Sequence, residues 1–489
     1  MLCFKSGGRK MPRKHFILVV PFILLLMLVQ CNLIQKKRLD TKELKNIVEK
    51  VENSNGITKT TMKKDTINWV GMWKGEGKRE VFIKNLINEY NFSHPNVYIN
   101  FKFREDIPEF TAIKSDIQDM ADALFTAHMI EQNRYDWDIV LMLSSSMYQY
   151  VGDELGMPDW GYEYLVDFKN VPGYLETENP DIISNHAFTD PYDGIFTGPF
   201  IEGAYFVMYC NQDLAEEIGF EIKQFDMTVD DLINYVKKIT DYNQTNGSNI
   251  APFYENGDWL TMSILFEHLF RSAIGYSLDY QAPETFSKKH QMALRECLEV
   301  YETLGQYKPV IDSQPQNTWA GSRDLVLKDK AVFYINGTWM YNMWEKIDSS
   351  KVNKMIPCEF PVLKKMNFYN GEYKSNYTVL SHSPKKEQAI KALMLLASED
   401  AATDWVRMAK SPTGVKMDFE QFGAGGDPIE SFVIQMIQKY GRNIGNAPPP
   451  IFGTKHLDVR IDGQGLLAIL RGKMTAEDMM NQYLAMNLQ

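Results

Sequence analysis

The hydrophobic pattern changes its period twice between residues 66 and 103, which predicts two strands with a helix between them. Residues 66–70 form a short apolar segment, and residues 97–103 alternate between apolar and polar side chains as a half-buried strand does. Residues 81–90 instead place their apolar side chains at the spacing of one helix face. The segment therefore predicts a first α/β unit.

The same alternation continues through the rest of the chain. A helix is predicted over about 114–130, before the apolar run 138–143, which is typical of a parallel strand buried on both faces. Strands alternating with helices predict an α/β fold with a doubly wound sheet. Further strands are predicted at 204–209 and 330–335, and helices at 215–218, 229–240, 260–272, 288–304, 385–397 and from 476.

The N-terminus has the pattern of an export signal. Residues 1–30 carry five basic side chains and no acidic one, and they include the apolar run Phe16–Val29. A helix of that run is roughly 21 Å long, too short to span a membrane core of about 30 Å comfortably. The run ends at Cys31 in a sequence that resembles the lipobox of bacterial lipoproteins, although Gln30 stands where a small residue is usual. We expect residues 1–30 to be a signal peptide and Cys31 to be lipidated.

Two alternatives to that interpretation stay open, an uncleaved membrane anchor and a plain signal peptide. Met11 is a second possible start, because basic residues follow it directly. The polar segment 31–65 is expected to be a lipid-anchored tether that holds the folded body near the membrane surface.

The charge is distributed unevenly along these parts. The formal net charge of -11 divides into +5 over residues 1–30, +4 over the tether with nine basic and five acidic residues, and -20 over the remainder. A strongly acidic body argues against nucleic acid as a partner. The five cysteines form no C-x-x-C pair, so neither a disulfide framework nor a zinc ribbon is predicted.

Three blocks of the body resemble bacterial extracellular solute-binding protein family 1, the sugar-binding lipoproteins of ABC importers. The first runs from Asp193-Gly194 through Pro199 to Asn211-Gln212-Asp213-Leu214, with Cys210 where the family has tyrosine. The other two are the segment 328–339, which ends in Gly337-Thr338-Trp339, and the segment 411–415. The order and spacing of the blocks fit from about residue 66 to the end of the chain.

The resemblance implies a two-lobed periplasmic-binding-protein type II fold with a hinge and an interlobe cleft. It places residues 66–203 and 378–428 in the first lobe and residues 204–377 and 429–489 in the second. It also implies a monomer at the outer face of the cell membrane. The partners that it implies are a carbohydrate ligand of the oligosaccharide class and the transmembrane subunits of an ABC permease. Neither a cofactor nor an enzymatic activity is expected.

Carbohydrates are bound by aromatic faces and by planar polar groups, and both are expected to follow the predicted strands that end at the cleft. Trp339 follows Asn336-Gly337 and lacks the alternation expected of a core strand residue. The candidate ligand-binding residues are Met72, Trp73, Ser144, Ser145, Glu202, Trp259, Trp339 and Thr413.

Five of these candidates also have a purely structural interpretation. Trp73 could cover the edge of a lobe, and Ser144 or Ser145 could cap a helix. Glu202 could be a solvated charge at the rim, and Thr413 could belong to a turn.

The sequence lacks the common catalytic and metal-binding motifs. It contains no H-E-x-x-H, G-x-S-x-G, Walker or dinucleotide-binding glycine pattern, and its eight histidines do not cluster. Asp241 to Gly247 is similar to a calcium loop, but its glycine is one position late, so no metal site is predicted. Two other functions stay open, a secreted glycosidase and a lipoprotein that reports a ligand to a membrane receptor.

Overall fold

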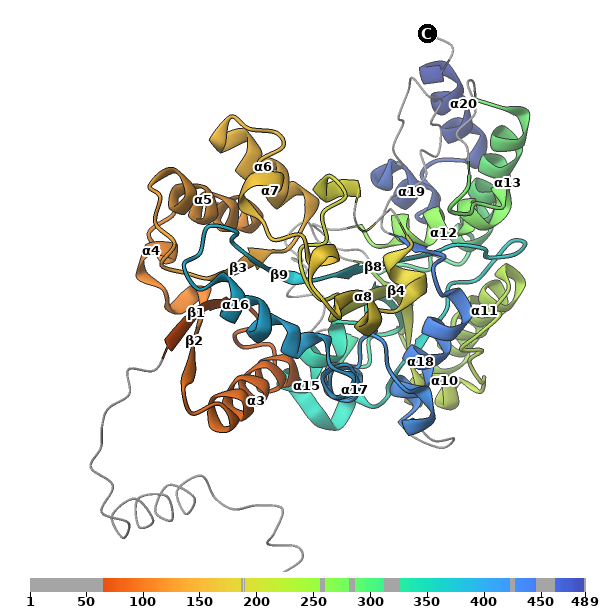
Figure 1. The fold of residues 1–489 in the computed structure, drawn as a ribbon. Coiled ribbons are helices and arrows are strands. Elements are labelled where there is room, and N and C mark those ends of the chain that lie inside the picture. Colours follow the sequence, from red (N-terminus) through yellow and green to blue (C-terminus); the bar gives the residue numbers. More distant parts are fainter. Residues whose placement is uncertain are drawn as a thin grey trace, which may run out of the picture. The chain divides into compact units, whose positions relative to one another are not determined.

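The computed structural model describes most of the chain after the predicted tether (Figure 1). The predicted signal peptide, nearly all of the predicted tether, the predicted lipidation site Cys31 and the candidate Trp259 lie outside the described residues. Within the described part, no helix has both the length and the apolar character needed to cross a membrane. The described ranges are 65–115, 117–185, 188, 190–255, 260–280, 286–311, 326–422, 427–445 and 462–487.

The first sheet has the strand order β2-β1-β3-β9. Strands β1 (Asp65–Gly71), β2 (Val97–Phe103) and β3 (Ile139–Met142) are parallel, as the alternation of strands and helices predicted. All four residues of β3 are buried, which explains why the sequence there is a continuous apolar run. Strand β9 (Asn376–Val379) comes from far along the chain and pairs antiparallel with β3.

The second sheet has the order β10-β8-β4-β6-β5, with β7 paired to β4 beside this path. Its central strand β4 pairs antiparallel with β6, β7 and β8, so the doubly wound parallel arrangement does not extend to this sheet. Among the named strands of the described part, the pairs β5–β6 and β8–β10 of this sheet are parallel. The strands are β4 (Glu202–Asn211), β5 (Ala251–Tyr254), β6 (Ala331–Gly337), β7 (Met355–Cys358), β8 (Tyr369–Lys374) and β10 (Ile444–Gly445).

The helices begin where the sequence supplies caps. In α11 the side chain of Thr228 accepts from the backbone N–H of Asp231, and the Asp231 carboxylate accepts from that of Thr228 in return. Pro428 opens α18 after the capping residue Asp427. The helices are α3 (Lys78–Ser93), α4 (Pro108–Thr111), α5 (Gln118–Glu131), α6 (Ser145–Leu155), α7 (Gly161–Tyr164), α8 (Tyr174–Thr177), α9 (Pro180–Ile183), α10 (Gln212–Ile218), α11 (Val229–Asn246), α12 (Met262–Ile274), α13 (Lys288–Gly305), α15 (Met340–Val352), α16 (Lys386–Leu393), α17 (Glu399–Ala409), α18 (Pro428–Tyr440), α19 (Gly463–Leu470) and α20 (Ala476–Asn487).

The chain passes between the two sheets more than once. It enters the second sheet at Glu202, returns to the first at Ser375, and leaves again between α17 and α18. The blue α17 therefore lies beside the orange α3 in Figure 1, whereas α18 packs on β7. The predicted lobe boundaries stay a prediction; β9 begins two residues before the predicted return at 378.

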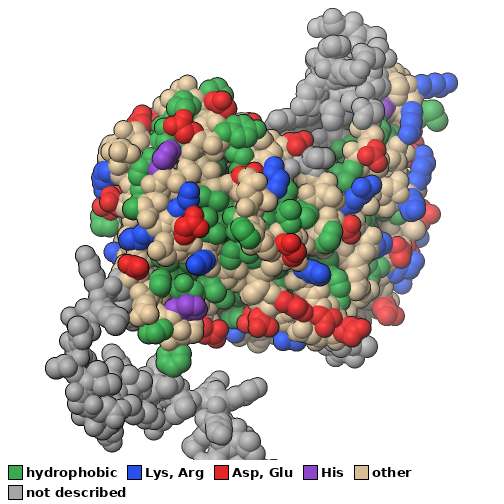
Figure 2. All heavy atoms as spheres, in the orientation of Figure 1, with side chains coloured by type: hydrophobic (Ala, Val, Ile, Leu, Met, Phe, Trp, Pro, Cys, Tyr) green, Lys and Arg blue, Asp and Glu red, His purple; other side chains and the backbone are tan. Residues whose placement is uncertain are grey.

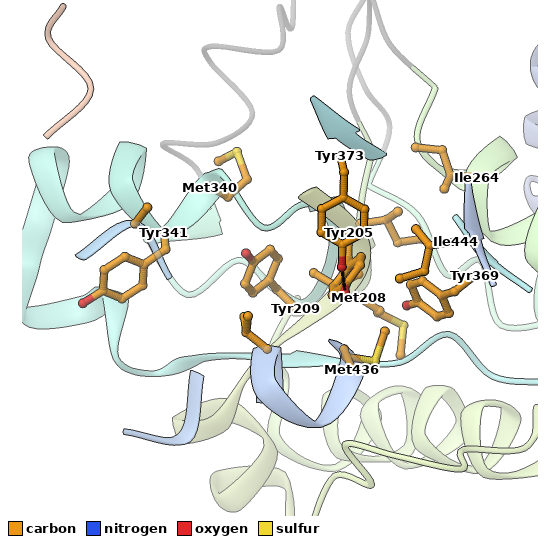
Figure 3. Packing of buried hydrophobic residues seen from close by; sticks show 14 of the residues in the cluster. Tyr205, Met208, Tyr209, Ile264, Met340, Tyr341, Tyr369, Tyr373, Met436 and Ile444 are labelled. Atoms are coloured by element: carbon orange, nitrogen blue, oxygen red, sulfur yellow. Dashed lines mark hydrogen bonds between the residues drawn. The ribbon is translucent and has the colours of Figure 1, made fainter. Parts of the chain in front are cut away.

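A tyrosine-rich core holds β4 and β8 together. These are the second-sheet strands at which the chain arrives from the first sheet and returns to it. Figure 3 shows Tyr205 of β4 and Tyr373 of β8 pointing toward one another, and their hydroxyl groups form a hydrogen bond. Both rings are buried, and Tyr369 packs edge-on against Tyr205 with ring centroids 6.1 Å apart. This packing fixes β8 on β4 at the point where the chain changes sheets.

Candidate functional site

The ribbon made by β4 and β8 has two unlike faces. Paired residues of antiparallel strands point to the same side, and Glu202 is paired with Lys374 while Ala204 is paired with Glu372. Along this part of the ribbon, the side chains that remain half-exposed are Phe206, Glu372 and Lys374, and all of them belong to that one face.

The opposite face carries the glycines and tyrosines of the core. Gly203 has no room for a side chain, because a Cβ atom there would lie 2.7 Å from the ring of Tyr373 and 2.8 Å from the carbonyl oxygen of Pro412. The other face is called here the crossing face (Glu202, Ala204, Phe206, Glu372 and Lys374), and it is partly exposed at Phe206, Glu372 and Lys374.

Trp339 lies at one side of the crossing face. It follows β6, directly before α15, and its side chain is half-buried. Its ring meets that of Phe206 edge-on, with the centroids 5.4 Å apart and the planes at 83°. This pair gives the crossing face an aromatic surface.

Charged and phenolic groups lie near the other side. The Lys374 ammonium is 3.2 Å from the Glu372 carboxylate. Burial alone would lower the pKa of Lys374, but the carboxylates of Glu372 and Glu202 outweigh it and the pKa is raised. Lys374 therefore carries its charge at neutral pH.

Tyr192 is half-buried and lies in the electrostatic field of Lys374, Glu372 and Asp119. Burial raises its pKa, and the charges of Glu372 and Asp119 add to that effect while Lys374 opposes it. The phenol is thus neutral and can both donate and accept a hydrogen bond. Asp119 accepts a hydrogen bond from Ser144, which stands where β3 leads into α6.

A family model described as bacterial extracellular solute-binding protein matches residues 100–416, which is more than half of the chain. The chain belongs to this family. The comparison with curated protein sequences found no match.

Solved structures confirm the two-lobed α/β fold of this solute-binding protein. A sugar transporter protein of Rhizobium etli in an open conformation has a TM-score of 0.58 and 15% identity, covering 85% of this chain and 97% of its own. Maltose-bound MalE3 of T. maritima has a TM-score of 0.56 and 16% identity, with coverages of 87% and 99%. The unliganded RafE of Streptococcus pneumoniae has a TM-score of 0.56 and 15% identity, with coverages of 84% and 98%.

Two of the predicted ligand contacts of the solute-binding protein are buried side chains. Trp73 is 2% exposed, with its ring centroid 5.0 Å from that of Trp405 and 5.8 Å from that of Tyr377. Thr413 is 1% exposed, and its hydroxyl donates to the carbonyl of Phe200. Trp73 is thus a core residue in this conformation, whereas its structural alternative was the edge of a lobe. Solute contacts of Trp73 and Thr413 stay predictions.

Glu202 is buried as well, and both of its carboxylate oxygens have protein partners. Oε1 accepts from Arg79 at 2.8 Å and Oε2 from Asn376 at 2.6 Å. Burial alone would raise the pKa of Glu202, but Arg79, Lys374 and the amide of Asn376 outweigh it and the pKa is lowered. Glu202 is therefore a paired, ionised carboxylate within the protein, rather than the solvated rim charge that was the alternative.

The remaining candidates lie at the ends of first-sheet strands. Met72 is half-buried after β1, and its backbone N–H donates to the hydroxyl of Tyr377 at 3.4 Å. Ser144 caps α6 by accepting from the N–H of Met147, and Ser145 is the half-exposed first residue of that helix. The helix cap is thus confirmed for Ser144, and solute contacts of Met72, Ser144, Ser145 and Trp339 stay predictions.

Sequence reasoning predicted Glu202 but missed the other two charged members of the crossing face. Glu372 and Lys374 lie in a polar strand whose alternation, Tyr-Asn-Gly-Glu-Tyr-Lys, could have revealed them. Tyr192 directly precedes the motif residue Asp193. It is distinguished from other loop tyrosines by its electrostatic interaction with Glu372 and Lys374 of β8, which the sequence does not show.

Neither a cavity elsewhere in the fold nor any metal-binding cluster among the described residues adds to the predicted ligand-binding residues. A cavity of about 710 Å³ lies between α10, β7 and the start of α18, and none of the predicted ligand-binding residues lines it. Within the described ranges, no group of His, Cys, Asp or Glu side chains is arranged to hold a metal ion.

Proposed function

We propose that this solute-binding protein captures a carbohydrate, most suitably an oligosaccharide, over the crossing face between its two sheets. One observation carries the proposal: the aromatic pair of Phe206 and Trp339 shares that face with Glu372 and Lys374. A sugar presents apolar C–H patches and hydroxyl groups side by side, so it matches a surface that combines rings with charged hydrogen-bonding groups.

Several structural neighbours bind ligands of this class. One is RafE in complex with raffinose, and another is maltose-bound MalE3. At identities of 14% and 16% these likenesses concern the fold, and the choice of a carbohydrate for this chain rests on its own crossing face.

The mechanism would require no covalent chemistry. A solute that contacts residues of both sheets binds the closed arrangement of the lobes more tightly than the open one, and so shifts the population toward it. We further propose that the closed form delivers its solute to an ABC permease, and that lipidated Cys31 keeps the protein at the outer face of the membrane.

Titration calorimetry of the full chain with a panel of neutral oligosaccharides tests the ligand class. Removal of the Trp339 ring in Trp339→Ala should weaken binding about tenfold, because covering about 60 Å² of apolar ring is worth roughly 1.5 kcal/mol. Phe92→Ala is the matched control, since this ring is 75% exposed at the end of α3.

Binding of an amino acid or phosphate in place of every sugar would refute the carbohydrate proposal. Full affinity of the Trp339→Ala variant would refute the assignment of the aromatic surface.

A further inference from the structure

Two of the three segments in which the chain crosses between the sheets are hydrogen-bonded to each other, and they are called here the crossings. Thr197, shortly before β4, shares a hydrogen bond of 2.6 Å with Ser375, the single residue between β8 and β9. The next residue, Asn376, donates its side-chain amide to Glu202, the first residue of β4. Each of these four side chains is no more than 4% exposed, so the crossings are joined inside the protein.

Asn376 has an unusual backbone conformation at this point. Its φ is +63°, in the left-handed region that asparagine tolerates better than most residues other than glycine. The turn lets the chain leave the second sheet after Lys374 and pair with β3 of the first sheet immediately afterwards. Asn376 thus combines the bend in the backbone with the hydrogen bond to the other crossing.

Arg79 connects the same point to the first sheet's helices. It lies at the start of α3, is 4% exposed, and donates from Nη1 to Glu202. The same nitrogen lies 3.4 Å from the carboxylate of Glu76, and Nη2 lies 3.4 Å from the hydroxyl of Ser411. One guanidinium therefore contacts the loop after β1, the start of β4 and the segment after α17.

We propose that Arg79, Glu202 and Asn376 form a hinge node that sets how the two sheets are held relative to each other in the absence of ligand. None of the three contacts a solute in this role. Arg79 and Asn376 are positioning residues. They act by holding Glu202, which is the first residue of the crossing face. The effect on affinity rests on the proposed function, whereas the effect on the crossings does not.

The physical reason is the low dielectric constant around the node. A buried carboxylate needs its partners, because an ionised group without them is strongly disfavoured away from water. Bending at either crossing would stretch the hydrogen bonds of Glu202 to Arg79 or Asn376. The crossings are therefore expected to open together, as one unit, rather than independently.

Amide hydrogen exchange of the full chain without ligand tests this inference. Asn376→Ala loses the amide and places a less tolerant residue at positive φ, and we expect exchange at 200–205 and 371–379 to accelerate at least tenfold relative to β1 and α11. Asn133→Ala is the matched control, since Asn133 also has a positive φ of 49° but is exposed between α5 and β3. It should leave both crossings unchanged.

Two further variants separate the amide from the backbone and guard against misfolding. Asn376→Gly keeps the conformational freedom and removes the amide, so it should still accelerate exchange at both crossings. Glu202→Gln removes the charge at the other crossing and should do the same. Unchanged exchange at 200–205 in all three variants, or a uniform increase over both sheets, would overturn the hinge node.

Calorimetry with a sugar from the panel gives the second readout. The node predicts a change in Kd of at least threefold in Asn376→Gly, although this side chain lies outside the proposed ligand surface. If no sugar binds the unmodified protein, the proposed function fails while the exchange experiment still decides the hinge node. If sugar binds and its Kd is unchanged in a variant with altered exchange, the link between the node and affinity is refuted.

Discussion

His268 provides a sharp test of how burial controls the stability of the second sheet. The ring lies on α12, is 0% exposed, and has its centroid 4.1 Å from that of Phe360. Its Nδ1 faces the carbonyl of Ile264 at 3.0 Å, and the N–H of Asn370 in β8 donates to Nε2 at 3.3 Å. A carbonyl only accepts, so Nδ1 carries the proton and the imidazole is neutral.

Protonation of this ring would place a charge in an apolar site. Burial, with a further contribution from the charge of Arg271, lowers the pKa of His268 from 6.5 to about 3. Because the folded-state pKa is lowered, the stability that this group contributes is present above pH 6.5 and is lost as the pH falls toward 3. Between pH 7 and 4.5 the loss from this one ring amounts to about 2.5 kcal/mol.

Urea denaturation at several pH values measures that loss. His268→Gln should be less stable than the unmodified protein at pH 7, because it loses ring packing. Between pH 7 and 4.5, however, the free energy of unfolding of this variant should fall by about 2.5 kcal/mol less than that of the unmodified protein. His128→Gln, which changes an exposed histidine on α5, is the control and should keep the original slope. Equal slopes in the His268→Gln variant and the unmodified protein would refute the reasoning.

Two other predictions concern different parts of the chain. Glu178 is 1% exposed, and burial raises the pKa of its carboxyl group above the ordinary carboxyl value. The unfolded chain therefore releases this proton at a lower pH than the folded protein does, so the group lowers stability as the pH rises above the ordinary value. Glu178→Gln should therefore stabilise the protein at pH 8 by on the order of 1 kcal/mol, with the gain shrinking toward pH 4, and lower stability of the variant in urea at pH 8 would contradict this. Cys31→Ala should release the protein from the membrane fraction, as an immunoblot of fractionated cells can show, whereas unchanged attachment would favour an uncleaved anchor.

The parts of the fold that sequence predicted are those whose signal is local. The apolar run at β3 reflects burial on both faces, and the alternation over 97–103 gave β2 with its observed bounds. The helix predicted over 229–240 begins at the observed residue, because Thr228 and Asp231 form a local cap. Each of these signals lies within the element that it predicts.

The surroundings of the candidate residues depend on parts of the chain that are far apart. Trp73 is predicted as a solute contact in a glycine-containing loop, and only the structure shows that Trp405 and Tyr377 cover its ring. Glu202 is predicted as a solute contact, with a solvated rim charge as the alternative, and only the structure places Arg79 and Asn376 beside it. Residue types and spacing cannot encode such neighbours, so burial at the junction of the sheets had to come from the structure.

The antiparallel strand β9 completes the first sheet from a distant part of the chain, because it pairs with β3. For the first sheet, everything between β3 and β9 is one very long loop whose two ends are neighbouring strands. The entropy of closing a loop rises only with the logarithm of its length, so inserting most of the second lobe there adds little to the cost of closure. The first sheet nevertheless stays incomplete until residues 376–379 have been synthesised. Because β9 interrupts the strands of the second sheet in the chain as well, neither sheet is built from a continuous segment.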